Sequence, residues 1–313
     1  MSLITYDLMG NKREKVQIAI ERLRAFEPED GYYLAFSGGK DSQCIYHLAE
    51  MAGVKFDAHY RITSVDPPEL VRFIKTQYPD VYMDYPRDKD GKVITMWNLI
   101  PRKLMPPSRL VRYCCSDLKE TAGKGRVTVT GVRWEECAAR QKNQGPVVIQ
   151  GKRAIKAAET NGADYSEQHK GKGIILNMDN AAERRTVEQC FRTQKTIVNP
   201  IIDWLKEDVW EFLNEVLKVP HCCKYDEGYD RLGCIGCPLT CHRGQELEAY
   251  PKYKTAYLRA FGRMIEERKR RGKETTFETP EDVMNWYLEK KPADEPVLDG
   301  QMDIEDLMEV QDE

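Results

Sequence analysis

The feature that most constrains the fold is a glycine turn between an apolar strand and a helix. An apolar run over residues 32–36 leads into the turn, and a helical pattern continues from it through Met51. The turn itself consists of Ser37, Gly38, Gly39, Lys40, Asp41 and Ser42. A strand that turns through two glycines into a helix directs several unpaired backbone N–H groups toward one point. The pattern therefore predicts a phosphate-binding loop.

The residue types in this loop favour an anion that is accompanied by a metal ion. The two glycines permit close approach of the backbone, Lys40 adds a mobile cation, and the two serines offer hydroxyl groups. Asp41 would repel a bare phosphate, so Mg²⁺ is expected to come with it. The spacing differs from the GxxxxGK[ST] pattern of the Walker loop.

Length, charge and hydropathy limit the class of protein. A chain of 313 residues can bury a large core, and its net charge of -3 makes no overall demand for a nucleic-acid partner. No apolar stretch reaches the length of a membrane span, and no basic start precedes a hydrophobic segment. We therefore expect a cytoplasmic protein with no membrane partner.

Strand and helix patterns alternate along the first part of the chain. Apolar runs at 54–60, 81–85 and 126–130 follow the first strand, with helical patterns between them. Such alternation predicts an α/β fold with a doubly wound, mostly parallel sheet. Ligands of such sheets bind at the carboxyl ends of the strands.

Composition divides the chain into three expected parts. Residues 1–220 should form the α/β domain with the phosphate loop, interrupted by a basic surface insertion at about 141–173. Residues 221–291 should form a cysteine-containing, helical region. Residues 292–313 hold nine acidic and no basic side chains, so we expect a mobile acidic tail.

The ten cysteines predict metal or thiol chemistry, because a cytoplasmic chain rarely relies on disulfides. Cys234 and Cys237 form a CxxC turn, and one or both of the distant Cys114 and Cys115 could join them around an iron–sulfur cluster. A zinc site is the alternative, and it would draw on Cys222 or Cys223, Cys234, Cys237 and Cys241 or His242. Buried free thiols are a third interpretation. Ligand spacing and softness favour the cluster.

Several motifs taken together resemble the phosphoadenosine phosphosulfate reductase family. They are the hexapeptide at 37–42 and the segments 66–69, 112–115, 118–120, 131–133, 200–204, 208–210, 225–228 and 231–238. That family belongs to the adenine nucleotide alpha-hydrolase, or N-type ATP pyrophosphatase, superfamily. The resemblance covers roughly residues 30 to 265, and it identifies the hexapeptide as a PP-loop.

The resemblance implies an adenine nucleotide alpha-hydrolase-like fold that binds ATP with Mg²⁺. Residues 37–42 would hold the β- and γ-phosphates, and Gly131, Val132 and Arg133 would approach the nucleotide from a neighbouring strand. Lys40, Asp41 and Arg133 are then the catalytic candidates. In such enzymes an acceptor oxygen attacks the α-phosphate, AMP is joined to the acceptor and pyrophosphate leaves. Sulfur can then displace AMP.

The cysteines also look like the [4Fe-4S] pattern of adenylylsulfate reductases. Carried over to this chain, the ligands are Cys114, Cys115, Cys234 and Cys237, with Cys222 and Cys223 as substitutes. The chain departs from reductases in two ways. Those enzymes use a cysteine in a C-terminal segment as nucleophile, and this chain has none after Cys241. They also usually carry a degenerate loop, so the intact hexapeptide favours ATP.

The leading hypothesis is an ATP pyrophosphatase that adenylylates an acceptor for iron–sulfur-assisted sulfur transfer. Nucleic acid is the favoured acceptor, because residues 243–273 hold ten Lys or Arg against four acidic residues. A solvated helix face is the alternative for that basic run. The alternative functions are a sulfonucleotide reductase and a non-catalytic ATP-binding module with a protein partner. A homodimer is also compatible with the sequence.

Overall fold

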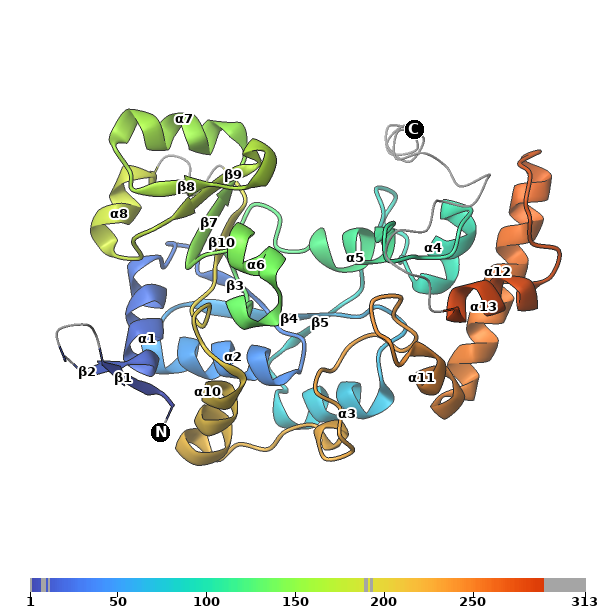
Figure 1. Cartoon of the computed structure of the whole chain (residues 1–313), viewed down its shortest axis with the longest axis horizontal. Helices are drawn as coiled ribbons and strands as arrows, with labels where there is room; N and C mark the ends of the chain where they lie inside the picture. The colour runs from blue at the N-terminus through green and yellow to red at the C-terminus, as the bar shows by residue number, and fades with distance from the viewer. Residues whose placement is uncertain (1, 7–9, 11, 189–190, 192–193, 290–313) are drawn as a thin grey trace. The chain divides into compact units, whose positions relative to one another are not determined.

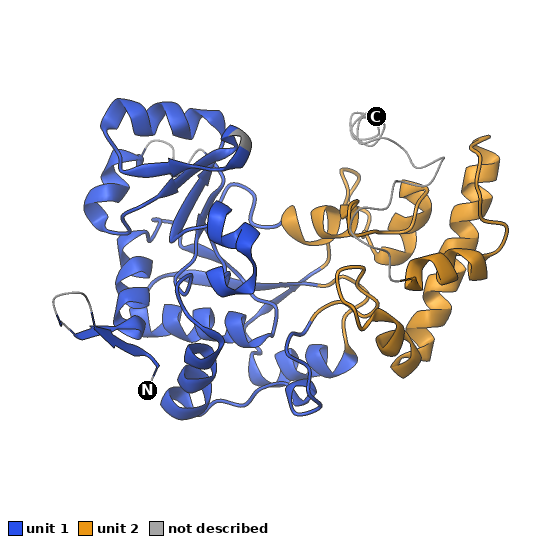
Figure 2. Cartoon of the chain, in the orientation of Figure 1, with its two compact units in different colours: residues 1–61, 68–84, 122–232 blue, residues 62–67, 85–121, 233–313 orange. Residues whose placement is uncertain are grey.

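The computed structural model describes residues 2–6, 10, 12–188, 191 and 194–289, which form two compact units. Unit 1 comprises residues 1–61, 68–84 and 122–232, and unit 2 comprises 62–67, 85–121 and 233–313 (Figure 2). Both units are therefore assembled from segments that are far apart in the sequence.

Unit 1 is built on an eight-stranded sheet with the order β5-β4-β3-β6-β10-β7-β9-β8. The five strands from β5 to β10 pair in parallel, and the last three join the sheet antiparallel. The strands are β3 (Tyr32–Ala35), β4 (Phe56–Arg61), β5 (Tyr82–Asp84), β6 (Thr128–Val129), β7 (Val147–Gln150), β8 (Tyr165–Glu167), β9 (Gly173–Leu176) and β10 (Thr196–Val198). The predicted α/β fold with a mostly parallel sheet is confirmed.

Helices alternate with the strands of unit 1, and a separate hairpin of β1 (Ile4–Tyr6) and β2 (Lys12–Glu14) precedes them. The helices are α1 (Lys15–Ala25), α2 (Lys40–Ala52), α3 (Pro68–Gln77), α6 (Ala138–Asn143), α7 (Lys152–Asn161), α8 (Ala181–Thr186) and α10 (Lys206–Glu211). Figure 1 shows α7 and α8 at the β8–β9 end of the sheet and α2 near β3. The central strand β3 is almost wholly buried, as expected for a parallel strand covered on both faces.

The segment 141–173 differs from the basic surface insertion that its composition suggests. Val147, Val148 and Ile149 of β7 are completely buried, and β7 pairs with both β10 and β9. A strand of four residues inside a polar stretch gives too short a periodic signal to be recognised. The segment therefore contributes to the core of unit 1 as well as to its surface.

The expected boundary at residue 220 does not coincide with the division into units. Residues 62–67 and 85–121 belong to unit 2, although the sequence predicts that they lie in the α/β domain. Residues 221–232 belong to unit 1. Composition can divide a chain only into continuous segments, whereas packing can join segments that are distant in the sequence into one unit. The expected acidic tail at 292–313 lies outside the described residues.

Unit 2 is helical and has its own hydrophobic core. Its helices are α4 (Met96–Lys103), α5 (Tyr113–Cys115), which continues into a π-helical turn (Ser116–Glu120), α11 (Arg243–Ala249), α12 (Pro251–Arg270) and α13 (Pro280–Leu288). Tyr257, Phe261 and Tyr287 are buried and lie with ring centroids 5.6–5.9 Å apart. The aromatic stripe of α12 is thus core. None of the described helices is both long enough and apolar enough to cross a bilayer.

Helix α2 offers a matched test of the core of unit 1. Leu48 is fully buried, whereas Met51, three residues along the same helix, is 44% exposed. We expect Leu48→Ala to lower the free energy of unfolding by about 2–5 kcal/mol, because it removes buried methyl groups and leaves a cavity. Met51→Ala should cost less than about 1 kcal/mol. Urea unfolding of both variants measures the difference, and equal losses would contradict the packing of α2.

Candidate active site

The hexapeptide lies between β3 and α2, at the carboxyl end of a central strand. Gly38 has φ 72°, and a Cβ atom there would come within 2.7 Å of the side chains of Leu70 and Ile74. Gly39 is the N-cap of α2 and supplies no side-chain cap. Gly39 thus offers no side chain of its own to the first turn of α2, and the dipole of that helix favours an anion at this point.

The loop holds its own hydroxyl groups in place. The Oγ atoms of Ser37 and Ser42 are 3.1 Å apart, and Ser42 Oγ also donates to the Gly39 carbonyl at 2.8 Å. Ser42 is buried and Ser37 is exposed. The hydroxyl group of Ser37 is thus the more accessible of the two.

Lys40 is the buried cation of the loop, with only 4% of its surface exposed. Burial lowers the pKa of its ammonium group, and the nearby Asp41 carboxylate opposes that shift. Lys40 Nζ lies 3.6 Å from Asp41 Oδ2 and donates to the carbonyl oxygen of Asp230 at 2.8 Å. The ammonium group thus lies among oxygens at the entrance to α2.

Arg133 lies against the loop from the neighbouring strand. Residues 131–133 follow β6, and Arg133 Nε donates to Asp41 Oδ1 at 2.7 Å. A Cβ atom on Gly131 would come within 2.9 Å of the Asp41 carbonyl oxygen, so glycine permits the close approach. Val132 is partly exposed between them. The segments 37–42 and 131–133 are therefore in direct contact within unit 1.

The charge of Arg133 is maintained by its acidic neighbours. Burial alone would lower the pKa of the guanidinium group, but Asp41 and Glu135 raise it by a larger amount. Arg133 Nη1 donates to Glu135 Oε2 at 2.5 Å. Asp41 is therefore the partner of an arginine in this structure. Mg²⁺ is usually bound through substrate phosphates together with one or two carboxylates, so the Asp41 carboxylate is of a type that this ion takes as a ligand.

Three residues that sequence reasoning did not assign to the site lie at the loop. Tyr225 Oη accepts a hydrogen bond from the backbone N–H of Lys40 at 2.9 Å, and Asp230 binds Lys206 at 2.5 Å. The segment 225–228 is one of the motifs of the sequence, but its pattern gives no hint of a contact with residue 40. Only the folded chain brings these residues together.

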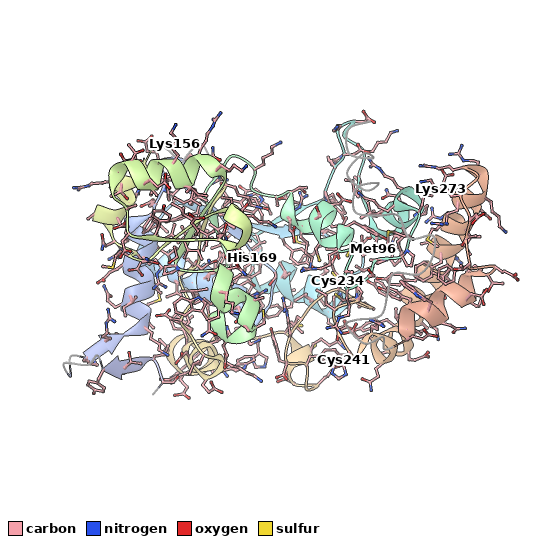
Figure 3. The ribbon with its side chains drawn as sticks, turned by 45° about the horizontal axis from the view of Figure 1, so that its top comes forward. Met96, Lys156, His169, Cys234, Cys241 and Lys273 are labelled. Atoms are coloured by element: carbon pink, nitrogen blue, oxygen red, sulfur yellow. The ribbon has the colours of Figure 1, made fainter. Side chains whose placement is uncertain are left out.

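The four predicted cluster ligands all lie in unit 2. Cys114 and Cys115 are on α5, and Cys234 and Cys237 form a turn in which the N–H of Cys237 donates to the Cys234 carbonyl at 3.2 Å. Gly236, with φ 69°, gives that turn its shape. Cys234 packs against the core of unit 2, which includes Met96, and Figure 3 labels both residues.

The thiols of this quartet influence one another. Hydrogen bonding to Cys115, followed by burial and by the charges of Cys115, Cys234 and Cys237, raises the pKa of Cys114. The same hydrogen bond, together with Arg112, lowers the pKa of Cys115 to about 5. Cys234 in turn raises the pKa of Lys119. Cationic neighbours of this kind favour thiolates.

The quartet fits an iron–sulfur cluster by its chemistry, since it offers four soft sulfur donors beside cationic side chains. Among the residues that the structure describes, however, no three His, Cys, Asp or Glu side chains converge on one point. The thiols would have to turn toward a common centre to bind a cluster. The alternates Cys222 and Cys223 lie in unit 1, where the first is buried and the second exposed.

A known protein family matches the part of the chain that contains these residues. The family described as the phosphoadenosine phosphosulfate reductase domain matches residues 31–240, which contain the glycine loop, residues 131–133 and the four cysteines. The chain belongs to this family. The resemblance inferred from the motifs is therefore confirmed at the level of the family.

Individual members of the phosphoadenosine phosphosulfate reductase family are more distant. An adenosine 5'-phosphosulfate reductase of Salinibacter ruber (strain DSM 13855 / M31) is 40% identical over 40 residues, which is 13% of this chain and 16% of that protein. A crystal structure of phosphoadenylyl-sulfate (PAPS) reductase from Candida auris, in a phosphate complex, is 14% identical with a TM-score of 0.39. That alignment covers 69% of this chain and 87% of the other.

Two glycines with similar backbone angles test the geometry of the loop. Gly38 and Gly53 have φ 72° and 68°, but a Cβ atom on Gly53 meets nothing within 4 Å. We expect Gly53→Ala to cost about 1–2 kcal/mol from backbone strain. Gly38→Ala should cost about 1–3 kcal/mol more, because its methyl group would crowd Leu70 and Ile74. Equal losses in thermal or urea unfolding would contradict the close packing of the loop.

Proposed function

We propose that the protein is an ATP pyrophosphatase that joins AMP to an acceptor and releases pyrophosphate. The observation that carries the proposal is the intact loop 37–42 at the start of α2, with Lys40 inside it and Arg133 against it. A sulfonucleotide has no β,γ-pyrophosphate to occupy such a loop. The loop therefore favours a triphosphate as substrate.

The proposed reaction is an in-line displacement at the α-phosphorus. The acceptor oxygen forms a bond to phosphorus as the bond to the bridging oxygen of the β-phosphate breaks, and the acceptor proton passes to solvent. Negative charge grows on the departing pyrophosphate, where the loop N–H groups and Lys40 would stabilise it. Mg²⁺ bound to the phosphates would neutralise part of that charge.

Asp41 is proposed to position Arg133. The carboxylate binds Nε of the arginine, and Glu135 binds Nη1, so the guanidinium is fixed at the edge of the loop. A fixed cation needs little reorganisation when charge develops next to it. Asp41 can also share in binding the Mg²⁺ that accompanies ATP.

We propose sulfur transfer as the purpose of the adenylylation. A sulfide donor would displace AMP from the activated acceptor, forming a carbon–sulfur bond as the carbon–oxygen bond breaks. The cysteine quartet would hold a [4Fe-4S] cluster, which when bound supplies iron sites for sulfur chemistry. Nucleic acid is the proposed acceptor, because α12 and the residues after it expose Lys252, Arg259, Lys269 and Lys273. Figure 3 labels Lys273 just beyond α12.

A sulfonucleotide reductase is the second candidate, and the family match over residues 31–240 favours it. Such an enzyme would release sulfite and a nucleoside phosphate from an adenylyl sulfate, with a dithiol as the reductant. It would need a nucleophilic thiol, which Cys223, Cys241 or a free member of the Cys114 and Cys115 pair would have to supply.

Pyrophosphate release separates these candidates. We expect the protein to release AMP and pyrophosphate from MgATP when nucleic acid or another acceptor is present. Lys40→Met should lower kcat/KM by about 10²–10³-fold, because it removes a preorganised positive charge that would stabilise the leaving pyrophosphate. Lys75→Met, an exposed lysine of α3, is the control and should leave the rate unchanged.

Sulfite release from an adenylyl sulfate, without pyrophosphate release from ATP, would contradict the pyrophosphatase and support the reductase. Tight binding of ATP with no turnover would instead support the non-catalytic module.

Metal analysis tests the cysteine quartet. An anaerobic preparation should contain iron and acid-labile sulfide in equal amounts, about four of each per chain. Cys234→Ala should lose both, whereas Cys241→Ala, which changes an exposed cysteine of the same unit, should retain them. Zinc without sulfide would contradict the cluster. Loss of iron in Cys222→Ala or Cys223→Ala would show that an alternate ligand is used.

A further inference from the structure

The glycine loop is covered in this structure by residues 225–230 of the same unit, a segment that we call the strap. Tyr225 Oη accepts a hydrogen bond from the Lys40 N–H at 2.9 Å, and the Asp230 carbonyl accepts one from Lys40 Nζ at 2.8 Å. Lys40 Nζ also lies 5.6 Å from the centre of the Tyr225 ring. Two donors that an anion would use are therefore occupied by oxygens of the chain itself.

The strap also binds a second cation. Lys206, the first residue of α10, donates from Nζ to the carboxylate of Asp230 at 2.5 Å. Lys40 and Lys206 thus bind the carbonyl and the carboxylate of one residue. A hydroxyl, a carbonyl and a carboxylate oxygen of the strap together satisfy one backbone N–H and two ammonium groups.

We propose that the strap is an internal phosphate mimic that closes the loop until the β- and γ-phosphates of ATP displace it. Lys206, released from Asp230, then becomes a further ligand of the triphosphate. The inference rests on the proposed function, because it places ATP at the loop. It adds a competing segment and a binding residue to that site.

The contacts of the strap are weak enough to be replaced. The Lys206–Asp230 pair is exposed, with 44% and 83% of the two side chains accessible, so it contributes little to stability. The Tyr225 hydroxyl is a neutral acceptor, whereas phosphate oxygens are charged and form stronger hydrogen bonds. A triphosphate therefore gains more from the same donors than the strap does.

The surroundings of Tyr225 give its ring room to move. A pocket of about 300 Å³ lies beside it and is lined by Trp210, Asn214, His221 and Tyr229 among others. The Tyr225 ring packs edge-on against Trp210, with centroids 5.0 Å apart. Displacement of the strap should therefore change the environment of the Trp210 indole.

Removal of one hydroxyl group tests the mimic. Tyr225→Phe keeps the ring but removes the oxygen that competes for the Lys40 N–H, so ATP and inorganic pyrophosphate should bind about fivefold more tightly. Tyr82→Phe, which removes the hydroxyl group of an exposed tyrosine on β5 of the same unit, should leave both affinities unchanged. Titration calorimetry with the full chain and Mg²⁺ measures them.

Kinetics and a second variant complete the test. Stopped-flow measurement of tryptophan fluorescence should give an observed binding rate constant that reaches a plateau as the ATP concentration rises. Loss of the signal in Trp210→Phe would assign it to that indole. Tyr225→Phe should raise the plateau of the rate constant. Lys206→Met should weaken the binding of ATP and of pyrophosphate about tenfold, and it should change the binding of AMP little.

Each alternative result has a distinct meaning. Unchanged or weaker binding of ATP by Tyr225→Phe would overturn the mimic, and tighter binding by Lys206→Met would overturn the role of Lys206 as a ligand. If the unaltered protein binds neither ATP nor pyrophosphate, the proposed function fails, and the inference fails with it.

Discussion

The contact between Arg133 and Asp41 joins the two parts of the candidate site. Asp41 lies in the first turn of α2, directly after the glycine turn, and Arg133 follows β6, which pairs with β3. Because Gly131 has no side chain, the two segments approach within van der Waals distance. A buried cation, a helix N-terminus and a fixed guanidinium are thereby placed at the carboxyl ends of adjacent parallel strands, where α/β sheets bind their ligands.

Much of this arrangement could be predicted from the sequence, because its signals are local. Alternating strand and helix patterns predict the parallel part of the sheet, and the order of residue types in 37–42 predicts the turn into α2. The buried strand β7 gives no recognisable signal, because its three apolar residues inside a polar stretch carry too little periodicity. The division into units, and the contact of Tyr225 with Lys40, depend on packing between segments distant in the sequence, which no local pattern encodes.

The family and the loop point to related but different substrates. Membership in the phosphoadenosine phosphosulfate reductase family is shown by the match over residues 31–240, and that family is named for a sulfonucleotide substrate. The loop adds donors that the proposed ATP would engage through its β- and γ-phosphates, and in this structure two of them bind oxygens of the strap instead. Unit 2 holds the four cysteines that are proposed as cluster ligands, and the proposed function joins them to nucleotide activation.

The most direct measurement of the central claim is a crystal structure of the protein with Mg²⁺ and α,β-methylene-ATP, which cannot be cleaved between its first two phosphates. The account predicts the β- and γ-phosphates on the backbone N–H groups of residues 39–42 and on Lys40, with the α-phosphorus exposed to an acceptor. A nucleotide bound elsewhere, with the Lys40 N–H still donating to Tyr225, would contradict it.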